Sequence, residues 1–147
     1  MSQSKEELVD VFGRRFALLI EGPMAGGRYE IRIWEGRRGP RGGQFLRAPI
    51  RGRDVDEARE RALEVLHNYV GLDRYRLMVE EIAHELAPGS TVEVGEDARD
   101  LRVALEGAYR LAVPLIMSRG EVLDPDADPE RLREAVRTHV QAHIRPR

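Results

Sequence analysis

Residues 28–58 read RYEIRIWEGRRGPRGGQFLRAPIRGRDVDEA, and the spacing of the apolar residues changes inside this stretch. From Arg28 to Glu35 apolar and polar residues alternate, which is the pattern of a half-buried β-strand. Residues 44–51 alternate again after a Gly-rich loop. From Asp54 onward the apolar residues recur at helical spacing instead. The stretch therefore predicts two strands of a meander that lead into a helix.

The residues before this stretch complete the predicted meander. Phe16 to Glu21 is a short apolar run that ends at Gly22 and Pro23, as expected for a strand followed by a turn. Three strands within residues 14–53 indicate an antiparallel sheet. We expect residues 2–12 to form a short helix, because apolar residues share one helical face there.

The residues after the stretch predict one long helix over residues 54–87. Asp54 and Glu57 have the spacing of a capping box, in which each side chain accepts a hydrogen bond from the other end of the first turn. Gly71 is expected to interrupt this helix, and Pro88 with Gly89 to end it. Thr91–Val94 is expected to add a fourth strand to the sheet.

Two further helices are predicted in the C-terminal half. A helix over residues 97–118 is expected from the apolar spacing that starts at Leu101, with deep burial of residues 111–117 and a kink at Pro114. A last helix is expected over residues 129–144, with Asp128 as its N-cap and Pro129 at its first position.

These elements predict one α+β domain spanning residues 1–147. A three- to four-stranded antiparallel N-terminal sheet packs against a helix, and a helical C-terminal half follows. A chain of 147 residues, 41% of them hydrophobic, is long enough to bury a core of this kind.

Positive charge is concentrated in the first third of the chain. Lys5 is the only lysine, and eight arginines lie within residues 28–53 against two glutamates. Up to Arg53 the chain has 11 basic and 6 acidic residues, a net of +5; beyond it there are 13 and 20, a net of −7. The overall charge of −2 hides this asymmetry, which indicates an anionic partner or a basic surface that meets an acidic one.

The candidate binding site is the predicted hairpin around the Arg/Gly loop at residues 36–43. A register that places Trp34 opposite Phe45 also places Arg32 opposite Arg47. One face of the sheet would then combine aromatic rings that stack on bases with guanidinium groups that bind phosphates. In the alternative reading a later helix covers this face and buries both rings. The candidate binding residues are Arg32, Trp34, Arg37, Arg38, Arg41, Phe45 and Arg47.

Few residues point to catalysis, a metal or a cofactor. The chain has no cysteine, and no serine lies in a nucleophile-elbow motif. His139 and His143 lie four residues apart, close enough to share a metal, but two ligands do not define a site. We therefore predict no catalytic residue, no metal and no cofactor. A deep pocket that holds His84 or His67 beside a carboxylate would favour the enzyme alternative.

Localisation follows from the absence of long apolar runs. We see no secretion signal and no run of 18 uncharged apolar residues, so we expect a soluble cytoplasmic protein without a membrane partner.

The order of strands and the opening of the first long helix resemble a known family. Phe16 to Val70, with the acidic capped sequence Arg53-Asp54-Val55-Asp56-Glu57-Ala58, is similar to the HicB-like antitoxin domain, in which a three-stranded meander leads into such a helix. The resemblance implies a binding role without catalysis, directed at a toxin or an RNA-like surface.

The function expected from the sequence is a non-enzymatic binding module. Its basic hairpin engages nucleic acid or an acidic protein surface. The alternatives are a structural or oligomeric subunit whose basic hairpin docks on the acidic helices of a neighbouring chain, a HicB-like antitoxin, and an enzyme of unknown class.

Overall fold

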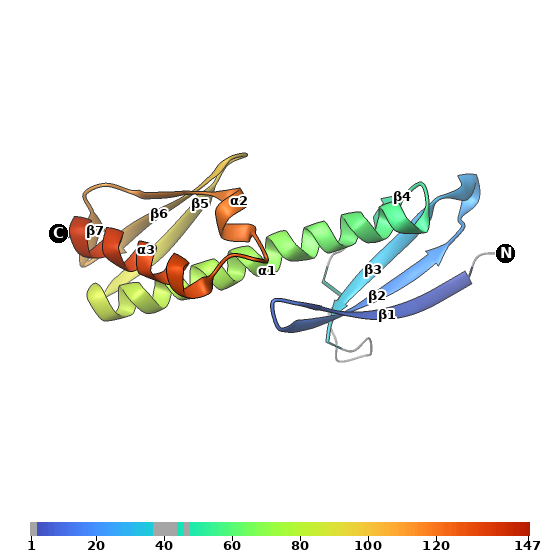
Figure 1. Ribbon diagram of the computed structural model, residues 1–147, viewed down its shortest axis with the longest axis horizontal. Helices are drawn as coiled ribbons and strands as arrows, with labels where there is room; N and C mark the ends of the chain where they lie inside the picture. Colours follow the sequence, from blue (N-terminus) through green and yellow to red (C-terminus); the bar gives the residue numbers. More distant parts are fainter. Residues whose placement is uncertain (1–2, 37–43, 46–47) are drawn as a thin grey trace. The chain divides into compact units, whose positions relative to one another are not determined.

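The computed structural model describes residues 3–36, 44–45 and 48–147 (Figure 1). The chain divides into two compact units, residues 1–70 and 71–147, and the helix α1 contributes to both. The strands are β1 (Gln3–Val11), β2 (Arg14–Gly22), β3 (Tyr29–Glu35), β4 (Ile50–Gly52), β5 (Ser90–Glu96), β6 (Asp100–Gly107), β7 (Tyr109–Leu111), β8 (Leu115–Ser118) and β9 (Ile144–Pro146). The helices are η1 (Ala25–Gly27, a 3₁₀ turn), α1 (Val55–Leu86), α2 (Arg119–Leu123) and α3 (Pro129–His143).

The first unit is a four-stranded antiparallel sheet in the order β1-β2-β3-β4, with the first half of α1 packed on one face (Figure 1). Alternate residues of β2 and β3 point toward α1, which meets them with small residues and so approaches the sheet closely. The buried residues of this core are Val11, Phe16, Leu18, Ile20, Ile31, Ile33, Ala58, Ala62, Leu66 and Val70.

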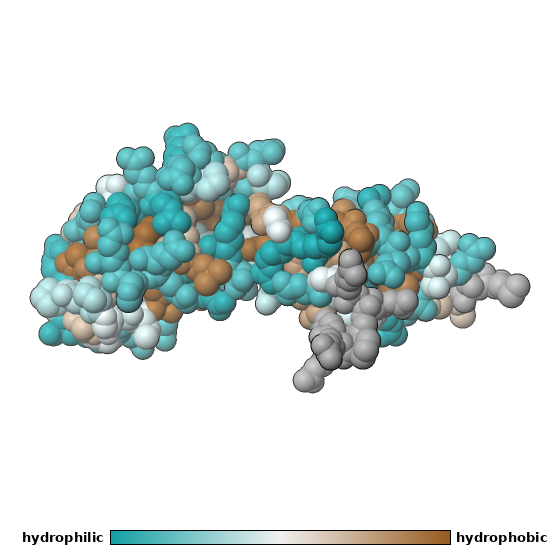
Figure 2. All heavy atoms as spheres, turned by 90° about the horizontal axis from the view of Figure 1, so that it is seen from below, coloured by the Kyte–Doolittle hydropathy of each residue, from teal (hydrophilic) through white to brown (hydrophobic). Residues whose placement is uncertain are grey.

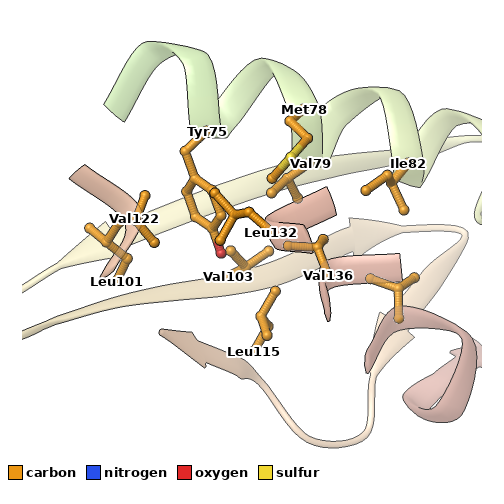
Figure 3. Packing of buried hydrophobic residues seen from close by; sticks show 11 residues of the cluster. Tyr75, Met78, Val79, Ile82, Leu101, Val103, Leu115, Val122, Leu132 and Val136 are labelled. Carbon is orange, nitrogen blue, oxygen red and sulfur yellow. The ribbon is translucent and has the colours of Figure 1, made fainter. Parts of the chain in front are cut away.

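The second unit combines a three-stranded antiparallel sheet, in the order β5-β6-β8, with a two-stranded sheet of β7 and β9. The second half of α1 and the helices α2 and α3 contribute the apolar residues that pack with this sheet (Figure 3). The largest core cluster consists of Tyr75, Met78, Val79, Ile82, Leu101, Val103, Leu115, Val122, Leu132, Val136 and Val140.

The α+β class, the N-terminal antiparallel sheet and its packing against a helix are confirmed. The cap of α1 is also confirmed, because Asp54 Oδ1 accepts a hydrogen bond from Glu57 N at 2.8 Å. Asp128 Oδ1 accepts one from Glu130 N at 3.0 Å and so caps α3, with Pro129 in its first turn. Contrary to the prediction, α1 continues through Gly71 without interruption.

The predicted helix over residues 2–12 is wrong, since Gln3–Val11 forms β1. Val11 pairs with Arg14, so a two-residue turn joins β1 to β2. Both turn residues, Phe12 and Gly13, have positive φ, as the hairpin turn that matches strand twist requires. The fourth strand of the first sheet is therefore β1, whereas the predicted strand Thr91–Val94 lies in β5 of the second sheet.

The predicted helix over residues 97–118 is also wrong, because β6, β7 and β8 occupy this segment. Leu101, Val103 and Leu105 alternate toward the core of the second unit, and β6 pairs with β5 on one side and β8 on the other. The expected deep burial of residues 111–117 fails as well, since Val113 is 48% exposed and Ile116 is 50% exposed. The C-terminal half is consequently mixed rather than helical.

The third predicted strand, residues 44–51, is shorter than expected. Among the described residues of this segment, 44–45 and 48–51, the strand β4 begins at Ile50, and Gln44 makes an isolated bridge to Trp34. Pro49 precedes the strand directly, and a proline has no N–H with which to extend a ladder of hydrogen bonds.

Candidate anion-binding surface

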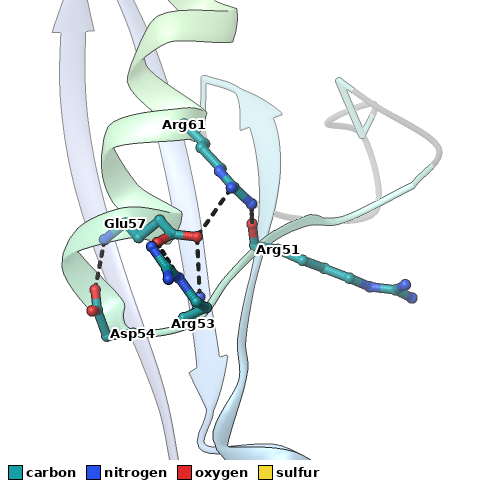
Figure 4. A network of polar contacts seen from close by, with 5 residues as sticks. All are labelled: Arg51, Arg53, Asp54, Glu57 and Arg61. Atoms are coloured by element: carbon teal, nitrogen blue, oxygen red, sulfur yellow. Dashed lines mark hydrogen bonds and ion pairs between the residues drawn. The ribbon is translucent and has the colours of Figure 1, made fainter.

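A network of charged side chains forms where β4 leads into α1 (Figure 4). Arg53 Nε donates to Glu57 Oε2 at 2.8 Å, while Asp54 caps the first turn of the helix. Arg61 lies one turn after Glu57 and contacts its Oε1 at 3.0 Å. The sequence produces this arrangement locally, because residues four apart lie on the same side of a helix.

Arg61 also joins the helix to the edge of the sheet. Its guanidinium nitrogen NH1 donates to the backbone oxygen of Arg51 at 2.8 Å. β4 is an edge strand, and edge strands present carbonyl groups that other chains can pair with. The hydrogen bond from Arg61 occupies one of these carbonyl groups. Figure 4 shows the Arg51 side chain pointing away from this network.

The charges in the network stabilise one another. The hydrogen bond from Arg53 lowers the pKa of Glu57, and the same contact raises the pKa of Arg53. Glu57 therefore stays ionised below the range in which an isolated glutamate takes up its proton.

Arginines on the sheet lie beside carboxylates of neighbouring strands. Arg32 Nε is 3.7 Å from Glu21 Oε1, and Arg51 Nε is 3.2 Å from Glu30 Oε1. The Arg51 side chain is still 62% exposed, and that of Arg53 is 87% exposed. Exposed pairs of this kind contribute only about 0–1 kcal/mol, so replacing the internal carboxylate by another anionic group would cost little.

A groove of about 600 Å³ lies beside this network in the first unit. Apolar residues and two arginines line it together with an amide and a carboxylate, so it offers both an apolar surface and hydrogen-bond donors. Its lining residues are Ala48, Pro49, Ile50, Arg51, Arg61, Glu64, Val65 and Asn68.

The predicted register between Trp34 and Phe45 is wrong by one residue. Trp34 bridges Gln44, and Phe45 N donates to Ile33 O at 2.7 Å. A shift of one residue reverses the face to which a side chain points. Phe45 accordingly packs edge to face against Phe16, with ring centroids 5.6 Å apart, and against Tyr69 at 4.6 Å. Trp34 is half-buried on the other face, as the cross-strand neighbour of Ala17.

The remaining candidate residues lie outside the described part of the chain. These are Arg37, Arg38, Arg41 and Arg47. Arg32, Arg51 and Arg53 thus all lie in the first unit, and Trp34 and Phe45 lie on opposite faces of its sheet. Sequence reasoning missed Arg61, although its spacing of four from Glu57 is a signal that could have identified it.

His67 and His84 are the two histidines that bear on the enzyme alternative. His67 Nδ1 lies 2.7 Å from Leu63 O of its own helix. His84 lines an open groove of about 550 Å³ with Glu80 and Glu81, and no hydrogen bond joins it to either carboxylate within the described residues. Across the same described ranges, no cluster of three or more His, Asp or Glu side chains could hold a metal.

No family model, curated protein or solved structure matches this chain. In the residues that the structure describes, none of the helices combines the length and the apolar character needed to cross a membrane. The surface seen in Figure 2 is mostly hydrophilic, with apolar residues reaching it in separate patches.

Proposed function

We propose that the protein is a non-enzymatic binding module that engages an anionic partner through its basic segment, residues 28–53. The observation that carries the proposal is the charge of this segment, which holds eight arginines against Glu30 and Glu35. A guanidinium group binds phosphate or carboxylate through two parallel hydrogen bonds, so arginine suits either partner.

The contacts of the described arginines would allow a partner's anionic groups to replace their internal carboxylate neighbours. Arg51 and Arg53 each have a carboxylate neighbour, yet most of each side chain reaches solvent. The groove next to Arg51 and Arg61 offers apolar surface to a partner held by these charges. Binding would replace weak internal pairs by contacts with the partner, without a change of fold.

The first test measures binding as a function of salt. The probes are fluorescent oligouridylate and a fluorescent polyglutamate peptide, followed by anisotropy between 50 and 200 mM salt. Release of counterions predicts that affinity for oligouridylate falls about tenfold or more if three phosphates are neutralised. Binding of polyglutamate alone would identify an acidic protein as the partner. An affinity unchanged over this range, or no binding of either probe at about 50 mM salt, contradicts the proposal.

Matched substitutions test whether the basic segment is the site. Arg51→Gln with Arg53→Gln should weaken binding and reduce its salt dependence. Arg76→Gln with Arg133→Gln is the control, because it also removes two charges and both arginines lie in the second unit, paired with Asp73 at 2.6 Å and with Glu81 at 3.0 Å. An equal loss of affinity in the control would show that total charge, rather than the basic segment, drives binding.

A second candidate function is a structural subunit in a homo-oligomer. The first unit has 13 basic and 11 acidic residues, a net of +2, and the second has 11 and 15, a net of −4. In addition, Leu8 is 55% exposed beside Ala17 and Trp34 on the face of the sheet opposite α1. Light scattering tests this candidate: a dimer that dissociates as salt rises supports it, and a monomer at every concentration contradicts it.

The resemblance to the HicB-like antitoxin domain remains a further proposal. The order β2, β3, β4 and α1 supports it, while β5 belongs to a different sheet from these strands. An RNA-like partner is anionic, so the oligouridylate probe above also tests the RNA version of this proposal.

A further inference from the structure

Two histidines lie side by side on α3, far along the sequence from the basic segment. His139 and His143 are four residues apart, and their ring centroids are 4.4 Å apart with a tilt of 45° between the rings. A metal binds imidazole nitrogen at about 2.0–2.1 Å, so two rings that share one ion must lie about this close together.

The ring of His139 is held in place by the chain before β8. Its Nε2 lies 2.8 Å from the carbonyl oxygen of Val113. A carbonyl only accepts hydrogen bonds, so Nε2 carries the proton and Nδ1 keeps the lone pair that a metal needs. Histidines that bind metals commonly donate their other ring N–H to a carbonyl or carboxylate in this way.

The surroundings leave room for a hydrated cation. An open groove of about 530 Å³ lies along this part of α3, and Arg131, Glu134 and Thr138 line it with both histidines, so the groove holds one guanidinium and one carboxylate besides the rings. His143 is the last residue of α3, where the partial negative charge of the helix end favours a cation. His143 O also accepts from Ala112 N at 2.8 Å, which fixes the helix end against the strand β7.

The sequence predicted no metal for this pair, because two ligands alone do not define a site. With the rings found side by side and His139 oriented by Val113 O, we propose that His139 and His143 bind one divalent transition-metal ion of the Cu²⁺, Ni²⁺ and Zn²⁺ class. Imidazole ligands favour these ions over Mg²⁺ and Ca²⁺, which prefer oxygen. Within the described residues no third histidine or carboxylate completes a cluster, so water fills the other coordination positions. The site lies in the second unit and does not depend on the anion-binding function.

The test is a calorimetric titration of the untagged, metal-free protein at pH 7.5 with Cu²⁺, Ni²⁺, Zn²⁺ and Mg²⁺. We expect one equivalent of metal to bind, with Cu²⁺ bound most tightly and no binding of Mg²⁺. Metal binding should weaken as acid is added, because a metal binds only imidazole that carries a free lone pair.

Substitutions locate the site. His143→Ala removes one of two ligands and should weaken binding at least tenfold, and the structure gives its ring no hydrogen bond to lose within the described residues. His139→Ala should do the same, with circular dichroism as the check on its fold. His84→Ala is the control and should leave the affinity unchanged.

Three results would overturn the proposal. The first is the absence of binding at millimolar metal. The second is an affinity of the His143→Ala variant equal to that of the unmodified protein. The third is loss of binding in His84→Ala alone, which would assign the metal to the groove with Glu80 and Glu81.

Discussion

Gly52 in β4 packs directly against Ala58 in α1. A Cβ atom added to Gly52 would overlap the backbone nitrogen of Ala58, and it would also lie 2.6 Å from the Cα atom. Because backbone atoms cannot move aside as a flexible side chain does, only glycine allows this approach of strand and helix. The contact fixes the start of α1 beside the edge of the sheet.

Gly52→Ala should therefore destabilise the protein by about 1–3 kcal/mol, the usual range for overpacking. Urea unfolding followed by circular dichroism measures the change. Gly95→Ala in β5 is the matched control, since the nearest atom to its added Cβ is Arg102 O at 3.9 Å. Equal effects of the two substitutions would show that the contact with Ala58 is not the cause.

Phe45→Ala should lower stability rather than remove a stacking contact with a partner. Phe45 packs edge to face with Phe16 and Tyr69, and each aromatic pair of this kind contributes about 0.5–1.5 kcal/mol beyond area burial. We expect a loss of about 1–3 kcal/mol in urea unfolding and unchanged affinity for oligouridylate. Unchanged stability with weaker RNA binding would mean that Phe45 contacts RNA directly.

Tyr75→Phe should leave the protein as stable or more stable, by about 1 kcal/mol. Tyr75 is 1% exposed, and its hydroxyl group has no hydrogen-bond partner within the described residues. Figure 3 shows the ring pointing from α1 toward Val103. Removing a buried hydroxyl without a partner removes its desolvation cost. Urea unfolding at pH 7 measures this change, and clear destabilisation would imply a hydrogen bond to bound water.

The same tyrosine predicts a dependence on alkaline pH. Burial raises the pKa of the Tyr75 hydroxyl above its ordinary value of 10, and the charge of Glu121 raises it further. Above about pH 10 a tyrosine in the unfolded chain loses its proton, whereas Tyr75 in the folded chain keeps its own, so the free energy of unfolding falls as the pH rises above that value. Unfolding between pH 9 and 11 should show a steeper loss in the unmodified protein than in Tyr75→Phe. Parallel profiles would contradict this prediction.

Asp97 predicts the opposite dependence at acidic pH. Its Oδ1 accepts from Arg99 N and Asp100 N, each at 2.8 Å, in the turn between β5 and β6. These backbone hydrogen bonds lower the pKa of Asp97. Its stabilisation is therefore present above the unfolded pKa, near 4, and is lost as the pH falls through the folded value. Asp97→Asn should be less stable than the unmodified protein at pH 7, and the difference should vanish near pH 2.

The parts of the fold that the sequence predicted correctly are those with a local chemical cause. Asp54 with Glu57, and Asp128 with Pro129, specify helix starts through side chains within one turn. By contrast, Leu101 and Leu105 fit a helical face, while Leu101, Val103 and Leu105 fit a strand equally well. Pairing with β5 and β8 decides between the two, and this pairing depends on residues distant in sequence.

The candidate site was predicted in part. Glu57 and Arg61 could be recognised as neighbours from their spacing, because helix geometry is regular. The pairing of Trp34 with Gln44 could not be recognised in the same way. A Gly-rich sequence does not specify which of its residues belong to the turn, so it does not fix the register of the strands on either side. Because the register differs by one residue from the predicted one, Phe45 packs against the core of the first unit and Trp34 lies on the opposite face of the sheet.

Two hydrophobic cores share the 32-residue helix α1, one through Ala58, Ala62 and Leu66 and the other through Tyr75 and Val79. An isolated helical segment of about 16 residues is marginal in water, so each half of α1 relies on its own core and on the helical turns that continue it. Melting of one half removes support from the other. Each half of α1 therefore depends on the other for its stability, and we expect calorimetry to find a single cooperative transition for the whole chain.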